Sequence, residues 1–315
     1  MTMDSRDLVK AAIAHRHTDR VPYCIGYTPD GKKELQRLIG EDRDADEFTD
    51  NDVLRVGPPW WNWHELAPDW RQMPTPTTPA NVIGRGSYEQ FFDDLKRLRD
   101  QTGKYLLVMV YGSHFEKANA ARGIENFLAD MAADPPFTRR LLRRIIDKNM
   151  VMLDNLLTAP EIDGVLLGSD WGTQLDLIMS PDTWQDMIRP GEQEEYDLIH
   201  SFDKDVWIHS CGNVEKIIPS LIEMGVQVLN PIQPEAMDLH RLKNDFGDKL
   251  TFWGGVSTQQ TLPYGTPEEV KVESRRVRDL LAEDGGLIFS PAQEIQGDVP
   301  AENIIALIEV ARETR

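Results

Sequence analysis

The stretch Val206–Asn213, VWIHSCGN, is the part of the sequence from which the fold and the chemistry of the chain are most directly inferred. Its first three residues favour a β-strand and Gly212 ends the run, so the pattern predicts a short buried strand. Because side chains alternate along a strand, His209 and Cys211 point to one face and Ser210 points to the other. An imidazole and a thiol side by side at the end of a strand supply half of a zinc site with nitrogen and sulfur ligands. The alternative is a buried histidine beside a buried free cysteine, both of which are ordinary core residues.

Seven further apolar runs alternate with segments of helical periodicity along the chain. They are Val21–Tyr27, Asp52–Gly57, Tyr105–Gly112, Gly164–Gly172, Val226–Gln233, Leu250–Ser257 and Leu287–Gln293. The runs are almost continuously apolar, as expected for parallel strands that are covered on both faces. Eight such strands with helices between them are typical of the α/β fold known as the (β/α)8 or TIM barrel. We therefore expect one barrel domain that spans residues 1–315.

Composition limits the partners and the compartment that we expect. The 315 residues carry a formal net charge of −19, which argues against nucleic acid and anionic membranes as partners. No segment is long and apolar enough to span a bilayer, and Met1–Pro22 lacks the apolar core of a signal peptide. Two cysteines exclude a disulfide framework and fit the reducing cytoplasm, where we expect the protein to reside.

In a barrel of this kind the chemistry lies at the carboxyl ends of the strands. Polar and aromatic side chains at these ends should therefore meet in one pocket with His209 and Cys211. They are Tyr27, Tyr111, His114, Asp170, Trp171, Gln174, Asn230, Glu235, Trp253, Gln293 and Glu294. The segment Trp60–Val82 has three tryptophans near its start and no clear periodicity, so we expect a loop that acts as a lid. The alternative is a loop whose tryptophans simply cover the rim of the barrel.

Short motifs across the chain resemble those of the uroporphyrinogen decarboxylase-like barrels, a family that includes zinc-dependent corrinoid methyltransferases. The matching stretches are Asp19–Pro22 (DRVP), Asp170–Gln174 (DWGTQ), His209–Asn213 (HSCGN), Asn230–Gln233 (NPIQ), Trp253–Val256 (WGGV) and Val299–Ile304 (VPAENI). They extend over almost the whole chain, so the resemblance implies the same barrel fold.

The resemblance also implies a set of metal ligands. Family members that pass a methyl group between a corrinoid protein and a thiol hold zinc through H-x-C and a later cysteine. His209 and Cys211 match the first two ligands, whereas Gln293 stands where the later cysteine is expected. Glu235 resembles a glutamate that some relatives offer to zinc, and its alternative is a solvated loop acid. We expect zinc here, with Gln293 or its neighbour Glu294 as a weak or exchangeable ligand.

Decarboxylation of uroporphyrinogen is the less favoured activity. True decarboxylases of the family carry an arginine-rich motif on the first strand that holds the carboxylates of the porphyrinogen. This chain has Tyr23–Thr28, YCIGYT, at that place, with no arginine. Asp170 resembles an acid that lies near the pocket floor across the family, and we expect it and Tyr27 to act in catalysis. Trp171, Gln174, Asn230, Trp253, Tyr111 and His114 are expected to bind the substrate.

The function that we expect is demethylation of a small donor, such as a methoxy compound, onto a corrinoid. A neutral Gln293 in place of a thiolate leaves a more electrophilic zinc, which suits activation of a donor; if Glu235 binds instead, this argument weakens. The sequence contains no D-x-H-x-x-G motif, so the corrinoid is expected on a separate partner protein. A homodimer is compatible with the sequence. The alternatives are a lyase of the decarboxylase type and a degenerate barrel that binds a small ligand.

Overall fold

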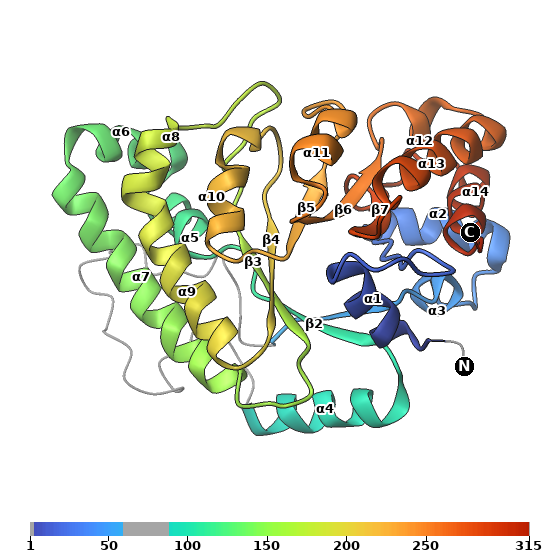
Figure 1. Cartoon of the computed structure of the whole chain (residues 1–315), viewed down its shortest axis with the longest axis horizontal. Coiled ribbons are helices and arrows are strands. Elements are labelled where there is room, and N and C mark those ends of the chain that lie inside the picture. Colours follow the sequence, from blue (N-terminus) through green and yellow to red (C-terminus); the bar gives the residue numbers. More distant parts are fainter. Residues whose placement is uncertain (1–2, 59–87, 315) are drawn as a thin grey trace.

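Seven parallel strands form one sheet in the computed structural model, which describes residues 3–58 and 88–314 (Figure 1). The strands pair in sequence order from β1 to β7, so each strand lies beside the next one along the chain. They are β1 (Val53–Val56), β2 (Tyr105–Met109), β3 (Gly164–Gly168), β4 (Asp205–His209), β5 (Val228–Ile232), β6 (Thr251–Val256) and β7 (Leu287–Pro291). The expected lid, Trp60–Val82, lies outside the described residues.

Helices cover one face of this sheet, and Figure 1 shows them on the outside of the strands, with α7 and α9 side by side. In the first half they are α1 (Ser5–Ile13), α2 (Pro29–Ile39), α3 (Ala45–Thr49), α4 (Tyr88–Gln101), α5 (His114–Arg122), α6 (Ile124–Ala133) and α7 (Pro135–Leu156). In the second half they are α8 (Pro181–Thr183), the π-helix η3 (Trp184–Ile188), α9 (Arg189–Ser201), the 3-10 helix η4 (Glu215–Ile217), α10 (Ile218–Glu223), α11 (Leu239–Phe246), α12 (Thr261–Tyr264), α13 (Pro267–Leu281) and α14 (Ala301–Ala311).

The first expected strand, Val21–Tyr27, is not a strand of this sheet. It is paired with the β7 side only through two isolated parallel bridges, Tyr23 to Phe289 and Tyr27 to Ile295. The prediction of eight strands is therefore confirmed for seven of them. The parallel α/β class is also confirmed.

Side chains explain why this segment does not form a regular ladder with β1. The Tyr23 carbonyl accepts a backbone hydrogen bond from Asp52, directly before β1. The N–H groups of Tyr23 and Ile25, however, donate to the side chains of Asp52 and Asn51, at 3.0 and 2.7 Å. Two side-chain oxygens thus replace the backbone carbonyls that a strand partner would supply.

Inward-facing side chains of the strands form a compact cluster with Val9 and Ala12 of α1, on the face of the sheet opposite the outer layer of helices. Strand residues alternate between the two faces, so Trp207 faces inward while Val206 and Ile208 pack against the helices. The inner cluster contains Val9, Ala12, Cys24, Val53, Tyr105, Leu107, Leu166, Trp207, Val228, Trp253 and Ile288. These residues fill the interior at the amino-terminal side, so they form a floor beneath the ends of the strands.

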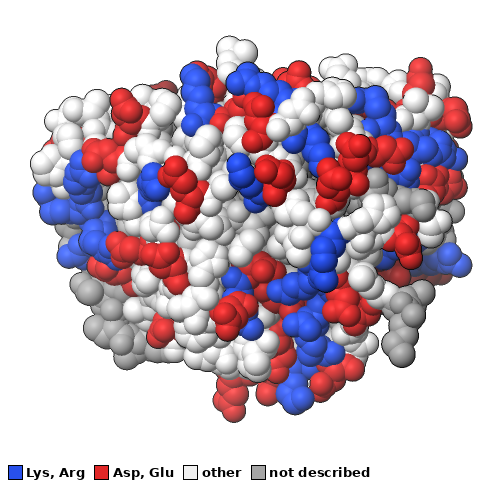
Figure 2. Space-filling model, in the orientation of Figure 1, with Lys and Arg blue, Asp and Glu red and all other residues white. Residues whose placement is uncertain are grey.

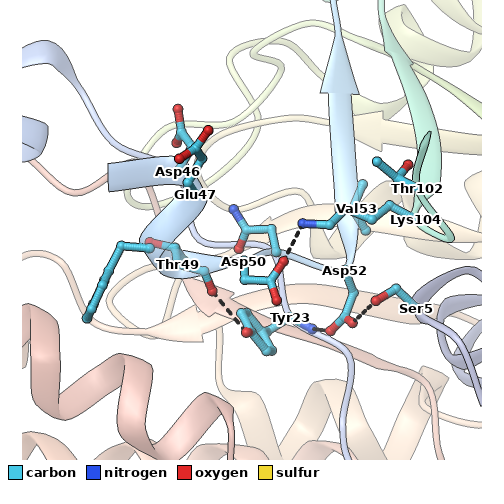
Figure 3. Close-up of polar contacts among 12 residues, drawn as sticks. Ser5, Tyr23, Asp46, Glu47, Thr49, Asp50, Asp52, Val53, Thr102 and Lys104 are labelled. Atoms are coloured by element: carbon cyan, nitrogen blue, oxygen red, sulfur yellow. Dashed lines mark hydrogen bonds and ion pairs between the residues drawn. The ribbon is translucent and has the colours of Figure 1, made fainter. Parts of the chain in front are cut away.

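The Asp52 carboxylate joins three segments at the base of the sheet (Figure 3). It accepts two hydrogen bonds of 2.7 Å from the Arg20 guanidinium, one of 2.6 Å from the Ser5 hydroxyl, and the one from the Tyr23 backbone. The Asp52 side chain is 1% exposed. The charge is therefore buried with all its partners in place, and it ties α1 and the segment Val21–Tyr27 to β1.

The surface carries charges of both signs. Lys and Arg side chains lie among Asp and Glu side chains over the face shown in Figure 2, and several of them form ion pairs, such as Arg143 with Glu194 at 2.7 Å. None of the described helices combines the length and the apolar character that a membrane span needs.

The Asp52 cluster predicts an unequal effect of two aspartate substitutions. Asp52→Asn should lower the free energy of unfolding by about 2–4 kcal/mol, because the buried contacts lose their charge and Arg20 loses its partner. Asp50→Asn is the matched control, since Asp50 pairs with Lys104 at 2.7 Å but is 70% exposed, and it should cost less than about 1 kcal/mol. Urea unfolding of both variants measures the difference. Equal losses would show that the Asp52 contacts do not hold these segments together.

Candidate functional site

A cavity of about 460 Å³ lies at the carboxyl ends of the strands, directly above the aromatic floor. Its wall contains some residues of the inner cluster, such as Trp253, and inward-facing strand residues two positions further along the chain. Arg55 follows Val53 in this way, and His209 follows Trp207. Of the residues predicted from the sequence, the cavity brings together Tyr111, Asp170, His209, Cys211, Asn230, Trp253, Gln293 and Glu294.

The register of three strands orients the imidazole of His209. Gly168, His209 and Asn230 are direct neighbours across β3, β4 and β5. Asn230 donates its amide N–H to the Trp253 carbonyl at 3.1 Å, so its Oδ1 faces His209 Nδ1 at 2.6 Å. Nδ1 must therefore carry the proton, so Nε2 is unprotonated and its lone pair faces the Cys211 thiol. A fixed Nδ1–H with an unprotonated Nε2 is the arrangement of a histidine that binds a metal.

Two further possible ligand atoms lie close to this Nε2, so three converge at one point. It lies 3.4 Å from Cys211 Sγ and 3.7 Å from Asp170 Oδ1. Two ligands of one tetrahedral zinc, at the usual zinc–nitrogen and zinc–sulfur lengths, are about 3.5 Å apart. Asp170 Oδ1 also accepts the Cys211 backbone N–H at 2.9 Å, which holds the ends of β3 and β4 together. The spacing and the donor types therefore fit zinc.

Burial sets the protonation of the two central ligands when no cation is bound. Burial lowers the pKa of His209, so the imidazole is neutral at pH 7, as a metal ligand must be. Burial, and then the nearby charge of Asp170, raises the pKa of Cys211 to about 12. The thiol thus keeps its proton unless a cation compensates the charge of the thiolate.

Two consecutive residues after β7 contact opposite parts of the cavity. Gln293 reaches the side of the cavity that holds His209 and Cys211, where its amide nitrogen lies 2.7 Å from Cys211 Sγ. Glu294 turns away and pairs with Arg55 at 2.9 Å. Of the two residues expected as weak ligands, Gln293 therefore lies beside the candidate metal ligands, and Glu294 lies beside Arg55.

Comparison with known proteins identifies the family. A sequence profile described as uroporphyrinogen decarboxylase (URO-D) matches residues 66–314. The chain belongs to the uroporphyrinogen decarboxylase family. No curated protein matches its sequence. Among solved structures, a methyltransferase from Methanosarcina mazei is similar in fold, with a TM-score of 0.73 and 18% sequence identity over 98% of each chain. A family 5 xyloglucanase from Paenibacillus pabuli has a TM-score of 0.49 and 10% identity over 90% of each chain.

Two aromatic residues expected in the pocket of this family member face the helices instead. Tyr27 lies on the same side of its extended segment as Tyr23, and its hydroxyl bonds Thr49 Oγ1 at 2.6 Å. Trp171 is fully buried and packs edge-on against Trp184, with ring centroids 5.5 Å apart. Each is one position away from a residue that does line the cavity, and side chains of consecutive residues in extended backbone point to opposite sides, so both face outward.

Three other predicted residues also lie outside the group that lines the cavity. His114 begins α5 and is buried in the helix layer, where its Nδ1 is 3.4 Å from Glu192. Gln174 donates to Gln259 at 3.1 Å on an exposed loop. Glu235 accepts a hydrogen bond from Ser257 and lines a separate, shallower pocket after β5. Glu235 therefore does not join His209 and Cys211, because the loop carries it past the rim.

Arg55 is a cavity residue that the sequence did not single out. It is the third residue of β1, in an otherwise apolar run, and its side chain is 28% exposed. A single charge at an inward position of a buried strand was the signal that could have found it. Met109, at the end of β2, was missed for a different reason, because methionine is common in any core.

Because β3 and β4 lie in close contact, we expect alanine substitution of Gly168 and of Gly40 to lower the free energy of unfolding by different amounts. Gly168 (φ +115°) and Gly40 (φ +108°) both adopt conformations that L-residues rarely adopt. A Cβ on Gly168 would overlap the carbonyl oxygen of His209, whereas a Cβ on Gly40 meets nothing within 4 Å. Gly40→Ala should cost about 1 kcal/mol, and Gly168→Ala about 3 kcal/mol or more. Urea unfolding compares them, and equal losses would contradict the close approach of the two strands.

Proposed function

We propose that this member of the uroporphyrinogen decarboxylase family is a zinc-dependent methyltransferase. It would move a methyl group between a small methylated donor, such as a methoxy compound, and a corrinoid carried by a separate protein. The observation that carries the proposal is the convergence of His209 Nε2, Cys211 Sγ and Asp170 Oδ1 at one side of the cavity. Three protein ligands that offer nitrogen, sulfur and oxygen are typical of a catalytic zinc site, which keeps its fourth position open.

Asp170 takes the place that the sequence suggested for Glu235. Its carboxylate is already held by the Cys211 N–H, so little reorganisation is needed to make it the third ligand. With Cys211 as thiolate and Asp170 ionised, the two anions offset the charge of the metal. Even with a neutral Gln293, the zinc would therefore be less electrophilic than it would be without a carboxylate ligand, and charge alone does not choose the direction of transfer.

The residues around the cluster favour a small organic donor. When bound, zinc would supply a Lewis acid that polarises the atom bearing the methyl group. Tyr111 packs edge-on against the His209 ring, with centroids 4.9 Å apart, and restricts the space beside Nε2. Gln293 Nε2 donates toward Cys211 Sγ, and a donor approaching this point can displace the neutral amide. Trp253 and Met109 complete an apolar wall.

The corrinoid would approach from outside the chain. The cavity is at the carboxyl ends of the strands, where loops rather than helices surround the entrance in a fold of this kind. The fold is similar to that of the Methanosarcina mazei methyltransferase, which agrees with methyl transfer at this end of the strands. Cys24 and Cys211 are both free, which fits our expectation of a reducing cytoplasm.

The sheet would be a closed (β/α)8 barrel in this proposal. The extended segment Val21–Tyr27 occupies the place of the missing strand, since it bonds to Phe289 of β7 and to Asp52 before β1. Decarboxylation of a porphyrinogen is less favoured. Among the described residues that line the cavity, Arg55 is the only lysine or arginine, and one cation cannot hold several carboxylates.

The proposal predicts that metal and activity depend on the same residues. The purified protein should hold about one zinc per chain, and His209→Ala and Cys211→Ser should each lose most of it. Glu235→Gln is the matched control and should retain the metal. Metal analysis by mass spectrometry measures all four proteins.

Activity is measured with free cob(I)alamin as methyl acceptor and a panel of methoxy compounds, through the absorbance of methylcobalamin. Methylcobalamin with a small thiol tests the reverse direction. Cys211→Ser should reduce either rate at least about 100-fold, as expected when a group that acts in the transition state is removed. Full zinc occupancy in both His209→Ala and Cys211→Ser would contradict the proposal. So would a zinc-loaded wild type that transfers no methyl group in either direction.

A further inference from the structure

The cavity contains a partly buried cation, Arg55, on a different strand from the candidate metal ligands, and the proposed methyl transfer does not use it. Arg55 projects from β1 into the cavity, and its Nη1 donates to Glu294 at 2.9 Å. Among the described residues, Glu294 is its only hydrogen-bond partner. A guanidinium has five N–H donors, so most of them remain available on the cavity side.

The position of the guanidinium is set by Gly26. A Cβ at Gly26 would lie 2.7 Å from Arg55 Nη2, so the guanidinium packs directly on the backbone of this glycine. Gly26 itself lines the cavity together with Thr28 and Gln296. The cation is thus held in place by a close backbone contact, while the Glu294 side chain that pairs with it is 47% exposed. A ligand can displace such an exposed carboxylate at small cost, because water solvates Glu294 when it leaves.

From these contacts we propose that Arg55 is the anchor for a carboxylate on the substrate. A carboxylate matches the planar fork of a guanidinium and can accept two parallel hydrogen bonds from it. The other end of the cavity holds His209 and Cys211, and an apolar stretch with Met109 and Trp253 lies along the wall. The ligand class is therefore an aromatic acid that carries its methoxy group at the end opposite the carboxylate. The methoxy part of this inference rests on the proposed function, whereas the carboxylate part does not.

Binding measurements test the anchor without any methyl transfer. Isothermal titration calorimetry of the zinc-loaded protein compares 4-methoxybenzoate with 4-methoxybenzamide, which has the same shape and no charge. We expect the acid to bind about 10- to 100-fold more tightly than the amide. Arg55→Met should abolish this preference by weakening the acid alone. Gly26→Ala, which keeps the charge and shifts the guanidinium, should reduce the preference.

Two control variants distinguish a carboxylate held by Arg55 from a carboxylate held by zinc. Glu294→Gln removes the competing carboxylate and keeps the shape, so it should bind the acid at least as tightly as the wild type; this variant tests the idea even if Arg55→Met does not fold. His209→Ala should keep the preference for the acid, since the carboxylate is held by Arg55 and not by the metal. Equal binding of acid and amide, no binding of either, or a preference that survives Arg55→Met would overturn the proposal.

The two proposals can fail separately. If methoxy donors are demethylated with no preference for acids, the anchor is wrong and the methyltransferase stands. If the acid binds through Arg55 but neither methyl-transfer reaction proceeds, the anchor stands and the methyltransferase is wrong.

Discussion

The candidate site depends on the register of three parallel strands. Gly168, His209 and Asn230 lie side by side across β3, β4 and β5, and a shift of one residue would turn His209 to the helix layer. The floor below holds this register. The Trp207 ring packs between two other aromatic rings, with its indole N–H donating to the Tyr105 hydroxyl at 3.0 Å. Packing of large side chains beneath the site therefore decides which atoms meet above it.

The cavity has two polar ends joined by one short loop segment. His209, Cys211 and Asp170 form a candidate metal site at one end, and Arg55 lies at the other. Gln293 and Glu294 are neighbours in sequence, yet one contacts Cys211 and the other contacts Arg55. A carboxylate that displaces Glu294 from Arg55 would thus move a residue that is directly bonded in the chain to Gln293. In the proposed complex, substrate binding at Arg55 would therefore be physically connected to the part of the cavity beside Cys211.

Much of the fold was predictable because each strand is an apolar run with clear ends. The pairing of His209 with Cys211 was also predictable, since it needs only the two-residue period of a strand. Tyr27 and Trp171 were misplaced because the period was applied without knowing which residues face inward. The position of Asp170 beside His209 and Cys211, and of Glu235 away from them, could not be predicted, because the Asp170–Cys211 hydrogen bond and the loop direction are long-range features. The segment Val21–Tyr27 failed to form a ladder for a similar reason, since Asp52 and Asn51 capture its N–H groups.

The central claim is a zinc bound by one sulfur, one imidazole nitrogen and oxygen donors. X-ray absorption at the zinc edge tests it most directly, with Gln293→Cys as a matched comparison. The account predicts one zinc–sulfur distance of about 2.3 Å and shorter nitrogen or oxygen distances of about 2.0–2.1 Å in the wild type. Gln293→Cys should add a second sulfur, because position 293 faces the same side of the cavity as Cys211 and is where the family resemblance places the later cysteine. A wild-type spectrum without sulfur, or a variant spectrum with an unchanged sulfur count, would contradict the account.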